Sequence, residues 1–246
     1  MDTPLVSVIL ATYNGSRFLW EAIESVLAQE YPNLELIIID DASTDREVWQ
    51  IIESYQKTDS RISTYRNDRN GERSWSKNLW TSKAQWEYIA FIDDDDIWMP
   101  QKLSEQIDVL LHQKNIWIVG TYTRFVDESG NILWDTTHLQ VDPRDIRNNL
   151  LFTNQFIHSS VFMRKSIFEE VWGFPIDMHL CEDYDLWLRV CSLTGEPISQ
   201  SVSCTTAYAH RARPRKISIV WSGWLYRLSG NIVVHIQDAC EPDSWK

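Results

Sequence analysis

Four consecutive aspartates, at positions 93–96, directly follow an apolar run at 88–92. Adjacent carboxylates repel one another, so some would be protonated or splayed apart unless a cation neutralised them. Mg²⁺ and Mn²⁺ prefer oxygen ligands, and a site with one or two carboxylates is completed by water and substrate phosphates. The segment therefore predicts a divalent metal and a diphosphate ligand. Asp96 alone could instead cap the helix expected from Pro100.

A second acidic segment, Glu182 and Asp183, begins a helix predicted over 182–191. Acidic residues in a first turn interact favourably with the helix dipole, which is a purely structural role. A carboxylate can also act as a general base, taking the proton of a hydroxyl that attacks an electrophilic carbon. Residue type alone leaves both roles open.

Short β-branched runs alternate with helical stripes through the first 115 residues. Strands are expected at residues 6–10, 34–39, 61–65 and 88–92, each followed by a helical pattern. This rhythm predicts an α/β fold, with a Rossmann-like, mostly parallel sheet covered by helices on both faces. The ligand crevice of such a sheet lies beyond the carboxyl ends of its strands, where the aspartates stand.

After about residue 115 the pattern becomes mixed. Two strands, 116–122 and 132–134, flank a turn at 127–131 and predict a hairpin. Further elements are expected as a helix at 143–151, a strand at 159–163 and a helix at 166–171. Because no linker-like composition interrupts the chain, we expect one domain over 1–246.

The composition narrows the class of protein. The chain has 246 residues, a formal charge of −12, 43% hydrophobic residues and 13 tryptophans, which excludes a disordered chain. An acidic protein without a basic footprint is not expected to bind nucleic acid. Four cysteines without a CxxC pair fit a reducing compartment. With no signal peptide and no run of about 20 apolar residues, the chain is expected to be cytoplasmic.

Five segments, in this order and spacing, resemble family 2 glycosyltransferases of the GT-A fold: residues 6–15, 36–45, 88–96, 171–174 and 182–189. The resemblance implies an inverting, metal-dependent enzyme that uses Mn²⁺ or Mg²⁺. It also implies a nucleotide-sugar donor, expected to be UDP-linked, and a carbohydrate or lipid-linked saccharide acceptor. Assembly of bacterial surface polysaccharide would be a fitting setting, at the inner face of the membrane if the acceptor is lipid-linked.

The resemblance also implies residue roles on the donor side. Ala11 and Tyr13 would line the nucleotide pocket, and Asp41 would accept the imino hydrogen of a uracil-like base. Arg73 and Lys77 would contact the diphosphate. These residues belong to a nucleotide-sugar-binding lobe expected over about 1–115.

Further roles concern the metal and the acceptor. Asp95 would bind the metal, with Asp93 or Asp94 contacting the metal or the ribose. Asp183 would be the catalytic base in an acceptor lobe over about 116–215. Three more residues would complete the substrate site: Glu182, the acceptor-wall residue Trp172, and His210, which would contact the metal or the diphosphate. Trp98, Trp172, Tyr184 and Trp187 are candidates for stacking on a sugar, although core packing is the better interpretation for any one tryptophan.

Two segments keep alternative interpretations. The basic cluster at 211–216 either closes over a diphosphate or is an exposed linker. An apolar stripe follows, and with the tail it is expected to form an amphipathic helix within 216–246. That stripe packs on its own domain or on a twin subunit in our preferred interpretation, and lies in a membrane interface in the other. His158 can be interpreted as a structural histidine.

Three rival functions fit the sequence less well than glycosyl transfer. A nucleotidyltransferase or phosphohydrolase would need a phosphate loop or a richer metal-ligand set, and the sequence has no GxxxxGK[ST] motif. A glycosidase with paired carboxylates does not require this acidic cluster. A non-catalytic nucleotide-sugar or carbohydrate binder of the same fold would not need Asp183. The sequence therefore favours a glycosyltransferase.

Overall fold

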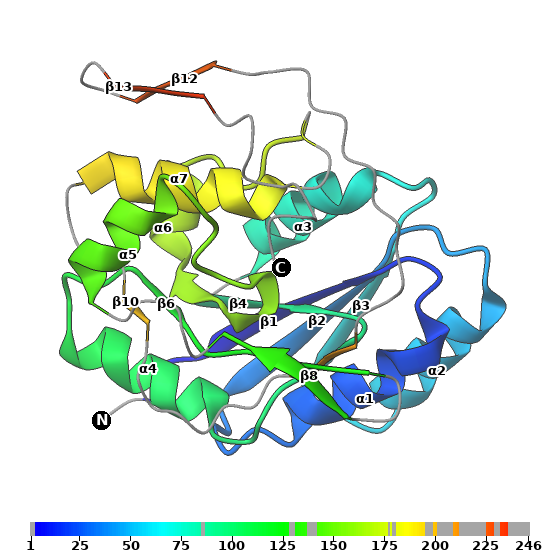
Figure 1. Ribbon diagram of the computed structural model, residues 1–246. Helices are drawn as coiled ribbons and strands as arrows, with labels where there is room; N and C mark the ends of the chain where they lie inside the picture. The colour runs from blue at the N-terminus through cyan, green and yellow to red at the C-terminus, as the bar shows by residue number, and fades with distance from the viewer. Residues whose placement is uncertain are drawn as a thin grey trace.

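A seven-stranded sheet forms the centre of the protein, in the order β10-β6-β9-β4-β1-β2-β3 (Figure 1). This computed structural model describes residues 3–84, 87–127, 131–136, 142–176, 178 and 181–194, and four strand segments at 199–200, 209–211, 225–228 and 232–235. The strands of the first half are β1 (Val6–Thr12), β2 (Leu34–Asp40), β3 (Ile62–Arg66) and β4 (Tyr88–Asp93). All four pair in parallel, as the alternating pattern predicts.

The register of these strands brings their carboxyl ends to one edge. Ala11 of β1 is paired with Ile39 of β2 and with Asp93 of β4. β1, β2 and β4 are mostly apolar and almost entirely buried, since both faces of the sheet are covered, whereas β3 at the edge is only partly buried. The polar residues that follow β1, β2 and β4 therefore meet at the same edge.

Helices cover both faces of the sheet (Figure 1). Those of the first half are α1 (Ser16–Leu27), α2 (Arg46–Gln56), α3 (Glu72–Lys83) and α4 (Lys102–His112). Asp45 caps α2, its side chain accepting a bond from the Glu47 amide at 2.9 Å. Asp96 does not cap α4, because it forms the short strand β5 (Asp96–Ile97). The helix-cap interpretation of Asp96 is therefore wrong.

The second half contributes strands to the same sheet. β6 (Ile118–Gly120) and β10 (Ser199–Gln200) extend it, and β9 (Phe162–Arg164) lies antiparallel between β6 and β4. The predicted strand at 159–163 thus starts later, because His158–Ser160 forms the 3₁₀ turn η1. The predicted helices are confirmed as α5 (Pro143–Leu150), α6 (Lys165–Glu170) and α7 (Glu182–Thr194).

The hairpin prediction was wrong in one strand. β8 (Ile132–Asp135) pairs with β7 (Arg124–Val126), not with residues 116–122. Ile118–Gly120 is buried throughout and belongs inside the main sheet. β5, β7 and β8 form a second sheet with β11 (Ala209–Arg211).

The predicted C-terminal helix is also wrong where the structure describes that segment. Leu225–Leu228 and Ile232–His235 form the antiparallel strands β12 and β13. Three consecutive β-branched residues, at 232–234, favour a strand over a helix. Residues 212–224 and 236–246, with the rest of the predicted stripe and most of the basic cluster, lie outside the described residues. None of the described helices combines the length and apolar character needed to span a membrane.

Candidate functional site

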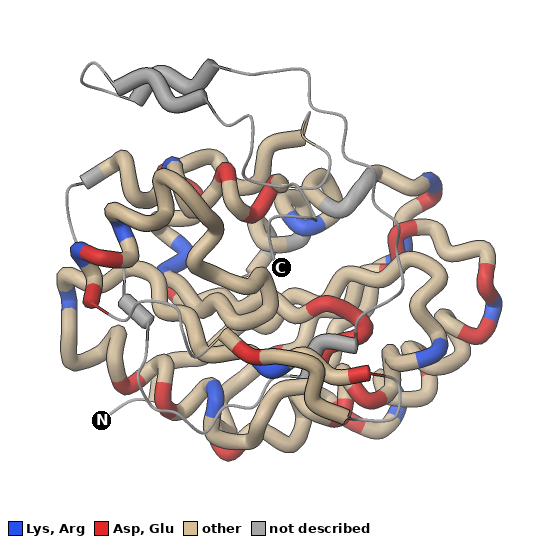
Figure 2. Tube along the Cα trace, viewed as in Figure 1, with Lys and Arg blue, Asp and Glu red and all other residues tan. Residues whose placement is uncertain are grey.

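Three of the four consecutive aspartates remain partly exposed at the end of β4. Figure 2 shows the acidic stretch on the chain trace. Asp96 is instead buried, 1% exposed, and accepts a hydrogen bond from Ser159 Oγ at 2.8 Å. Ser159 Oγ also accepts a bond from the Asp93 amide at 2.8 Å, and Thr12 Oγ1 donates to Asp94 Oδ2 at 2.5 Å. These bonds fix the acidic loop to β1 and η1.

Asp93, Asp94 and Asp95 fit a hard divalent cation by their chemistry. Carboxylate oxygens at a partly exposed sheet edge are the ligands that Mg²⁺ and Mn²⁺ prefer. Among the described residues, no group of three His, Cys, Asp or Glu side chains is arranged to hold a metal. An ion here would thus be held by one or two carboxylates and completed by water and phosphate oxygens.

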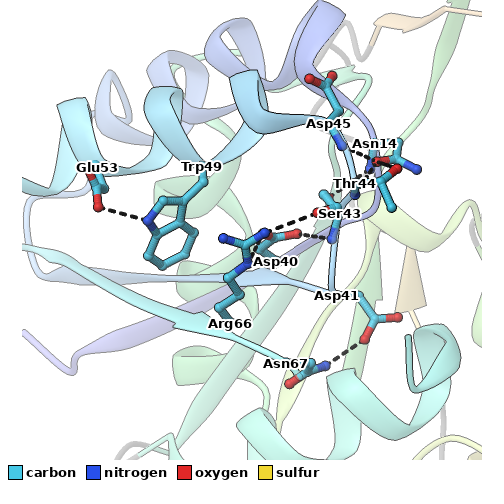
Figure 3. A network of polar contacts seen from close by, with 10 residues as sticks. All are labelled: Asn14, Asp40, Asp41, Ser43, Thr44, Asp45, Trp49, Glu53, Arg66 and Asn67. Carbon is cyan, nitrogen blue, oxygen red and sulfur yellow. Dashed lines mark hydrogen bonds and ion pairs between the residues drawn. The ribbon is translucent and has the colours of Figure 1, made fainter. Parts of the chain in front are cut away.

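Asp41, directly after β2, is the centre of a buried polar cluster. It is 4% exposed, and its Oδ1 accepts hydrogen bonds from Asn67 Nδ2 at 2.6 Å and Ser76 Oγ at 2.7 Å. The Gly71 amide donates to the same oxygen at 3.1 Å. In Figure 3 the other carboxylate oxygen of Asp41 points away from Asn67. The cluster fixes the orientation of the Asp41 carboxylate.

Asn14 and Ala42 shape the loops beside Asp41. Both have left-handed backbones, with φ of 55° and 63°. Asn14 Oδ1 accepts bonds from the amides of Thr44 at 2.9 Å and Asp45 at 3.0 Å, which ties the β1 loop to the β2 loop (Figure 3). A pocket nearby is lined by Ala42, Arg66, Asn67 and Asp68.

The predicted nucleotide-lining residues lie at this edge. Ala11 is partly buried beside Asp93, and Tyr13 is 46% exposed. Arg66 forms an ion pair with the buried Asp40, with 3.1 Å between Nε and Oδ2. Arg66 also donates a hydrogen bond to the Ser43 carbonyl. Arg66 therefore links Asp40 to the loop that follows β2.

Lys77 lies deeper than expected for a residue open to a ligand. It is 2% exposed, and its Nζ lies 3.3 Å from Asp93 Oδ1 and 2.7 Å from His158 Nε2. Lys77 therefore supports the acidic segment from inside the protein. Arg73 lies on α3, and its side chain is outside the described part of the structure.

Asp183 stands in the first turn of α7, as predicted. Loss of water around its carboxylate, reinforced by the negative charge of Glu182, raises the pKa of Asp183 to about 6. The Tyr184 amide and the charge of Lys77 act in the opposite direction, while Asp93 adds a further increase. Asn154 Nδ2 lies 3.5 Å from Asp183 Oδ2. These electrostatic effects connect Asp183 with the acidic segment at the end of β4.

The four aromatic residues considered for sugar stacking fall into two groups. Trp172 is 88% exposed and has a left-handed backbone with φ of 64°. Trp98, Tyr184 and Trp187 are buried, so the structure assigns them to the core and not to a sugar-stacking surface. Of these four, Trp172 alone is exposed, so core packing was the wrong interpretation for Trp172.

His210 enters the site region through strand pairing. On β11 it is paired with Asp96 of β5 and with Phe125 of β7. Its backbone thus lies beside the acidic segment, while its side chain is outside the described part of the structure.

Several residues of this region were missed or misjudged from the sequence. Thr12, Asn67 and Ser159 all contact predicted site residues. Thr12 and Asn67 follow the rule that strand ends line the site and could have been found in that way. Ser159 and His158 had no such signal, because η1 reaches β4 only through the tertiary fold.

Comparison with known proteins gives the family. Residues 7–172 match the model of Glycosyl transferase family 2. A glycosyltransferase of Haemophilus influenzae is 34% identical over 214 residues, 86% of this chain and 78% of the relative. The O-antigen biosynthesis glycosyltransferase WbnJ of Escherichia coli is 30% identical over 186 residues, 76% of this chain and 71% of the relative. A Methanocaldococcus jannaschii relative is 32% identical, and the chain spans 65% of its length.

Solved structures share the fold. Staphylococcus aureus TarS 1–349 in complex with UDP has a TM-score of 0.67 at 19% identity, covering 83% of this chain and 60% of that one. The mannosyltransferase PcManGT of Pyrobaculum calidifontis, in complex with GDP-Man and Mn²⁺, has a TM-score of 0.67 at 19% identity, covering 88% and 59%. The fold is that of the GT-A glycosyltransferases, and the chain belongs to glycosyl transferase family 2.

Proposed function

We propose that this chain transfers a sugar from a UDP-linked donor to a carbohydrate hydroxyl with inversion, and that Asp183 is the general base. The observation that carries the proposal is the Asp183 carboxylate, whose pKa is raised to about 6 and which interacts electrostatically with Lys77 and Asp93. A general base works best when its pKa is near the working pH. A carboxylate that only complemented a helix dipole would gain nothing from a raised pKa.

The proposed step is a single displacement. The acceptor oxygen forms a bond to the anomeric carbon while the bond from that carbon to the diphosphate oxygen breaks. The hydroxyl proton passes to Asp183 as the new bond forms. The leaving diphosphate carries away the electron pair. Attack on the face opposite the diphosphate inverts the anomeric configuration.

Asp95 is the first candidate for holding Mn²⁺ or Mg²⁺, with Asp93 as a second ligand and Asp94 beside the ribose. Asp93 pairs with the Lys77 ammonium, and the family resemblance places Asp95 on the metal. When bound, the ion would offset the negative charge on the departing diphosphate. His210 and Arg73 are proposed to contact the same diphosphate or, for His210, the metal. PcManGT supports the metal, since its structure contains Mn²⁺.

The bonds to Asp41 support uracil as the donor base. Three donors already end on Oδ1, so Oδ2 is the oxygen left to accept a bond from a ligand. Uracil offers one imino hydrogen, whereas guanine offers adjacent ring N–H and amino donors that pair with both oxygens of a carboxylate. Ala11 and Tyr13 would line this pocket. TarS, whose structures contain UDP and UDP-GlcNAc, is a neighbour with such a donor.

The acceptor is proposed to be a saccharide that lies between Asp183 and the turn at 172–174, with Glu182 in the same site. Exposed Trp172 provides an aromatic face of the kind that packs on sugar rings. The name of WbnJ, an O-antigen biosynthesis enzyme, supports a role in polysaccharide assembly.

Calorimetry with UDP and GDP, each with and without Mn²⁺, tests the donor site. We expect UDP to bind, to need the metal, and to bind more tightly than GDP. Failure of both diphosphates to bind under all conditions would contradict the transferase proposal.

The Asp183→Asn variant tests the base and separates an enzyme from a non-catalytic binder. We expect it to bind UDP normally and to lose nearly all transfer. Asp108→Asn, at a carboxylate 69% exposed on α4, is the matched control and should keep full activity. An Asp183→Asn variant with normal turnover would show that the base is another residue.

A further inference from the structure

The Lys77 ammonium is a buried cation at the meeting point of several elements. It extends from α3 and reaches Asp93 at the end of β4, with 3.3 Å between Nζ and Oδ1. His158 of η1 is closer, with Nε2 at 2.7 Å, and the Phe174 ring centroid lies 5.8 Å away. A buried charge is costly unless it is paired and hydrogen-bonded, so these partners decide where the ammonium lies.

The His158 ring is itself held firmly. It is 9% exposed and lies 5.3 Å from the Phe91 ring centroid and 5.6 Å from that of Phe174. The next residue, Ser159, bonds to the Asp93 amide and to Asp96. The turn that carries His158 is therefore fixed to the acidic segment, and the imidazole is a rigid support for Lys77.

The contact between the two side chains specifies a protonation state. Lysine carries donors only, so the imidazole nitrogen facing Nζ must be the acceptor. A Lys77 ammonium in this contact therefore pairs with the imidazole tautomer that carries its proton on Nδ1. The chain uses the histidine as a hydrogen-bond acceptor for a buried cation.

We propose that His158 is a positioning residue for glycosyl transfer, which holds the Lys77 ammonium where it serves both Asp93 and Asp183. The inference rests on the proposed function, because it assumes that Asp183 is the base. Three described charges act on Asp183: Glu182 and Asp93 are negative, and Lys77 is positive. A displaced Lys77 would leave two negative neighbours beside the base and remove a positively charged partner of Asp93.

The competing explanation is that His158 only packs against its neighbours. Two substitutions separate this packing role from the positioning role. His158→Phe keeps an aromatic ring between Phe91 and Phe174 but has no acceptor for Lys77. His158→Gln loses the ring and retains an acceptor oxygen. His112→Gln, at a side chain 74% exposed on α4, is the control for changing a histidine.

Activity is measured across pH together with thermal unfolding and UDP binding. We expect His158→Phe to fold and to lose about 10–100-fold in kcat, the range found for outer-shell residues that orient metal ligands. The acid limb of its pH profile should move to higher pH, because Asp183 has lost a positive neighbour. His158→Gln should recover most of the activity and the original acid limb. Equal losses in both variants with an unmoved acid limb would overturn the proposal.

Imidazole ¹⁵N NMR gives a readout that does not need activity. We expect His158 in the wild-type protein to be neutral at pH 7 with the proton on Nδ1, and Lys77→Met to shift the Nε2 resonance. A doubly protonated His158 at pH 7 would overturn the proposal. If NMR confirms the contact between Lys77 and His158 while no sugar donor supports transfer, the proposed function is wrong but the contact between the two side chains stands.

Discussion

The Thr12 hydroxyl donates to Oδ2 of Asp94 at 2.5 Å, joining the ends of β1 and β4 across the candidate site. Gly15 lies against the same pair. A Cβ at position 15 would overlap the Asp94 carboxylate, with its Cγ only 2.5 Å away, and would lie 2.7 Å from Thr12 Oγ1. The absence of a side chain at residue 15 therefore makes room for the Asp94 carboxylate.

Gly15→Ala should move Asp94 and leave the fold intact. The atoms in the way belong to the end of a side chain that can rotate, so a small stability change is expected. We expect metal-dependent UDP binding to weaken about 10-fold, as for other changes that misplace a supporting ligand. Calorimetry with Mn²⁺ measures this, and Thr12→Ser, which keeps the hydroxyl, is the control. Unchanged UDP binding by Gly15→Ala would show that Asp94 has no part in the donor site.

The raised pKa of Asp183 predicts the pH dependence of activity. A base must be deprotonated to act, so kcat/KM should fall tenfold per pH unit below about pH 6 and level off above it. A profile measured with saturating metal checks this. An acid limb centred near pH 4, the ordinary range of an aspartate, would contradict the prediction that the limiting carboxylate has a raised pKa.

The same pKa predicts a pH-dependent stability effect. Protonation of Asp183 stabilises the folded state, since its pKa rises from 3.8 in the unfolded chain to about 6. This stabilisation is complete below about pH 3.8 and is lost as the pH rises through about 6. Asp183→Asn should therefore raise Tm relative to the wild type at pH 8 and change it little at pH 4. An Asp183→Asn variant less stable than the wild type at pH 8 would contradict the inference that the ionised Asp183 carboxylate destabilises the fold.

Trp172 and Gly173 predict opposite stability changes. Both have left-handed backbones, with φ of 64° and 67°, but Trp172 is 88% exposed while a Cβ on Gly173 would lie 2.9 Å from Phe168 Cζ. Trp172→Gly should stabilise the fold by about 0.5–1 kcal/mol through relief of backbone strain. Gly173→Ala should destabilise it by about 2 kcal/mol or more through strain and overlap.

Denaturant unfolding measures both variants, and an unchanged m-value shows that the comparison is valid. If Trp172 also contacts the acceptor, Trp172→Gly raises the acceptor KM while the free energy of unfolding increases. A destabilised Trp172→Gly variant would show that the indole contributes packing that its exposure does not suggest.

Substitutions of Asn14 measure how much the connection between the β1 loop and the β2 loop contributes to the free energy of unfolding. Asn14→Ala removes the acceptor for the Thr44 and Asp45 amides and places alanine at a left-handed position. We expect a loss of about 2–3 kcal/mol in the free energy of unfolding. Asn14→Gly keeps the backbone conformation and should lose less. Equal losses would mean that the hydrogen bonds, and not the backbone, account for the whole effect.

The sequence predicted well where the strands end and which polar residues follow them, because this placement depends on local pattern. Apolar runs ended by polar residues specify β1, β2 and β4, and parallel strands place Thr12, Asp41 and Asp93 at one edge. Pattern also located Asp183 at the start of a helix, which α7 confirms.

What the sequence did not predict depends on distant contacts. Lys77 and His158 are 81 positions apart, and no pattern in either segment predicts their 2.7 Å contact. Asp96 was ambiguous for the same reason, since Ser159 decides its role. In the C-terminal segment a helical period and a β-branched run overlap, and the described part adopts strands.

The position of β9 has a consequence for synthesis on the ribosome. β9 pairs with β4 from the second half of the chain, so the inner edge of β4 has no partner strand until residues 162–164 have emerged. An unpaired edge of a buried strand is prone to wrong pairing. About 164 residues must therefore be made before the sheet formed by β1 to β4 can close on this side. An N-terminal fragment of about 115 residues would not be a transferable module, and recombination between family members should preserve β4 and β9 together.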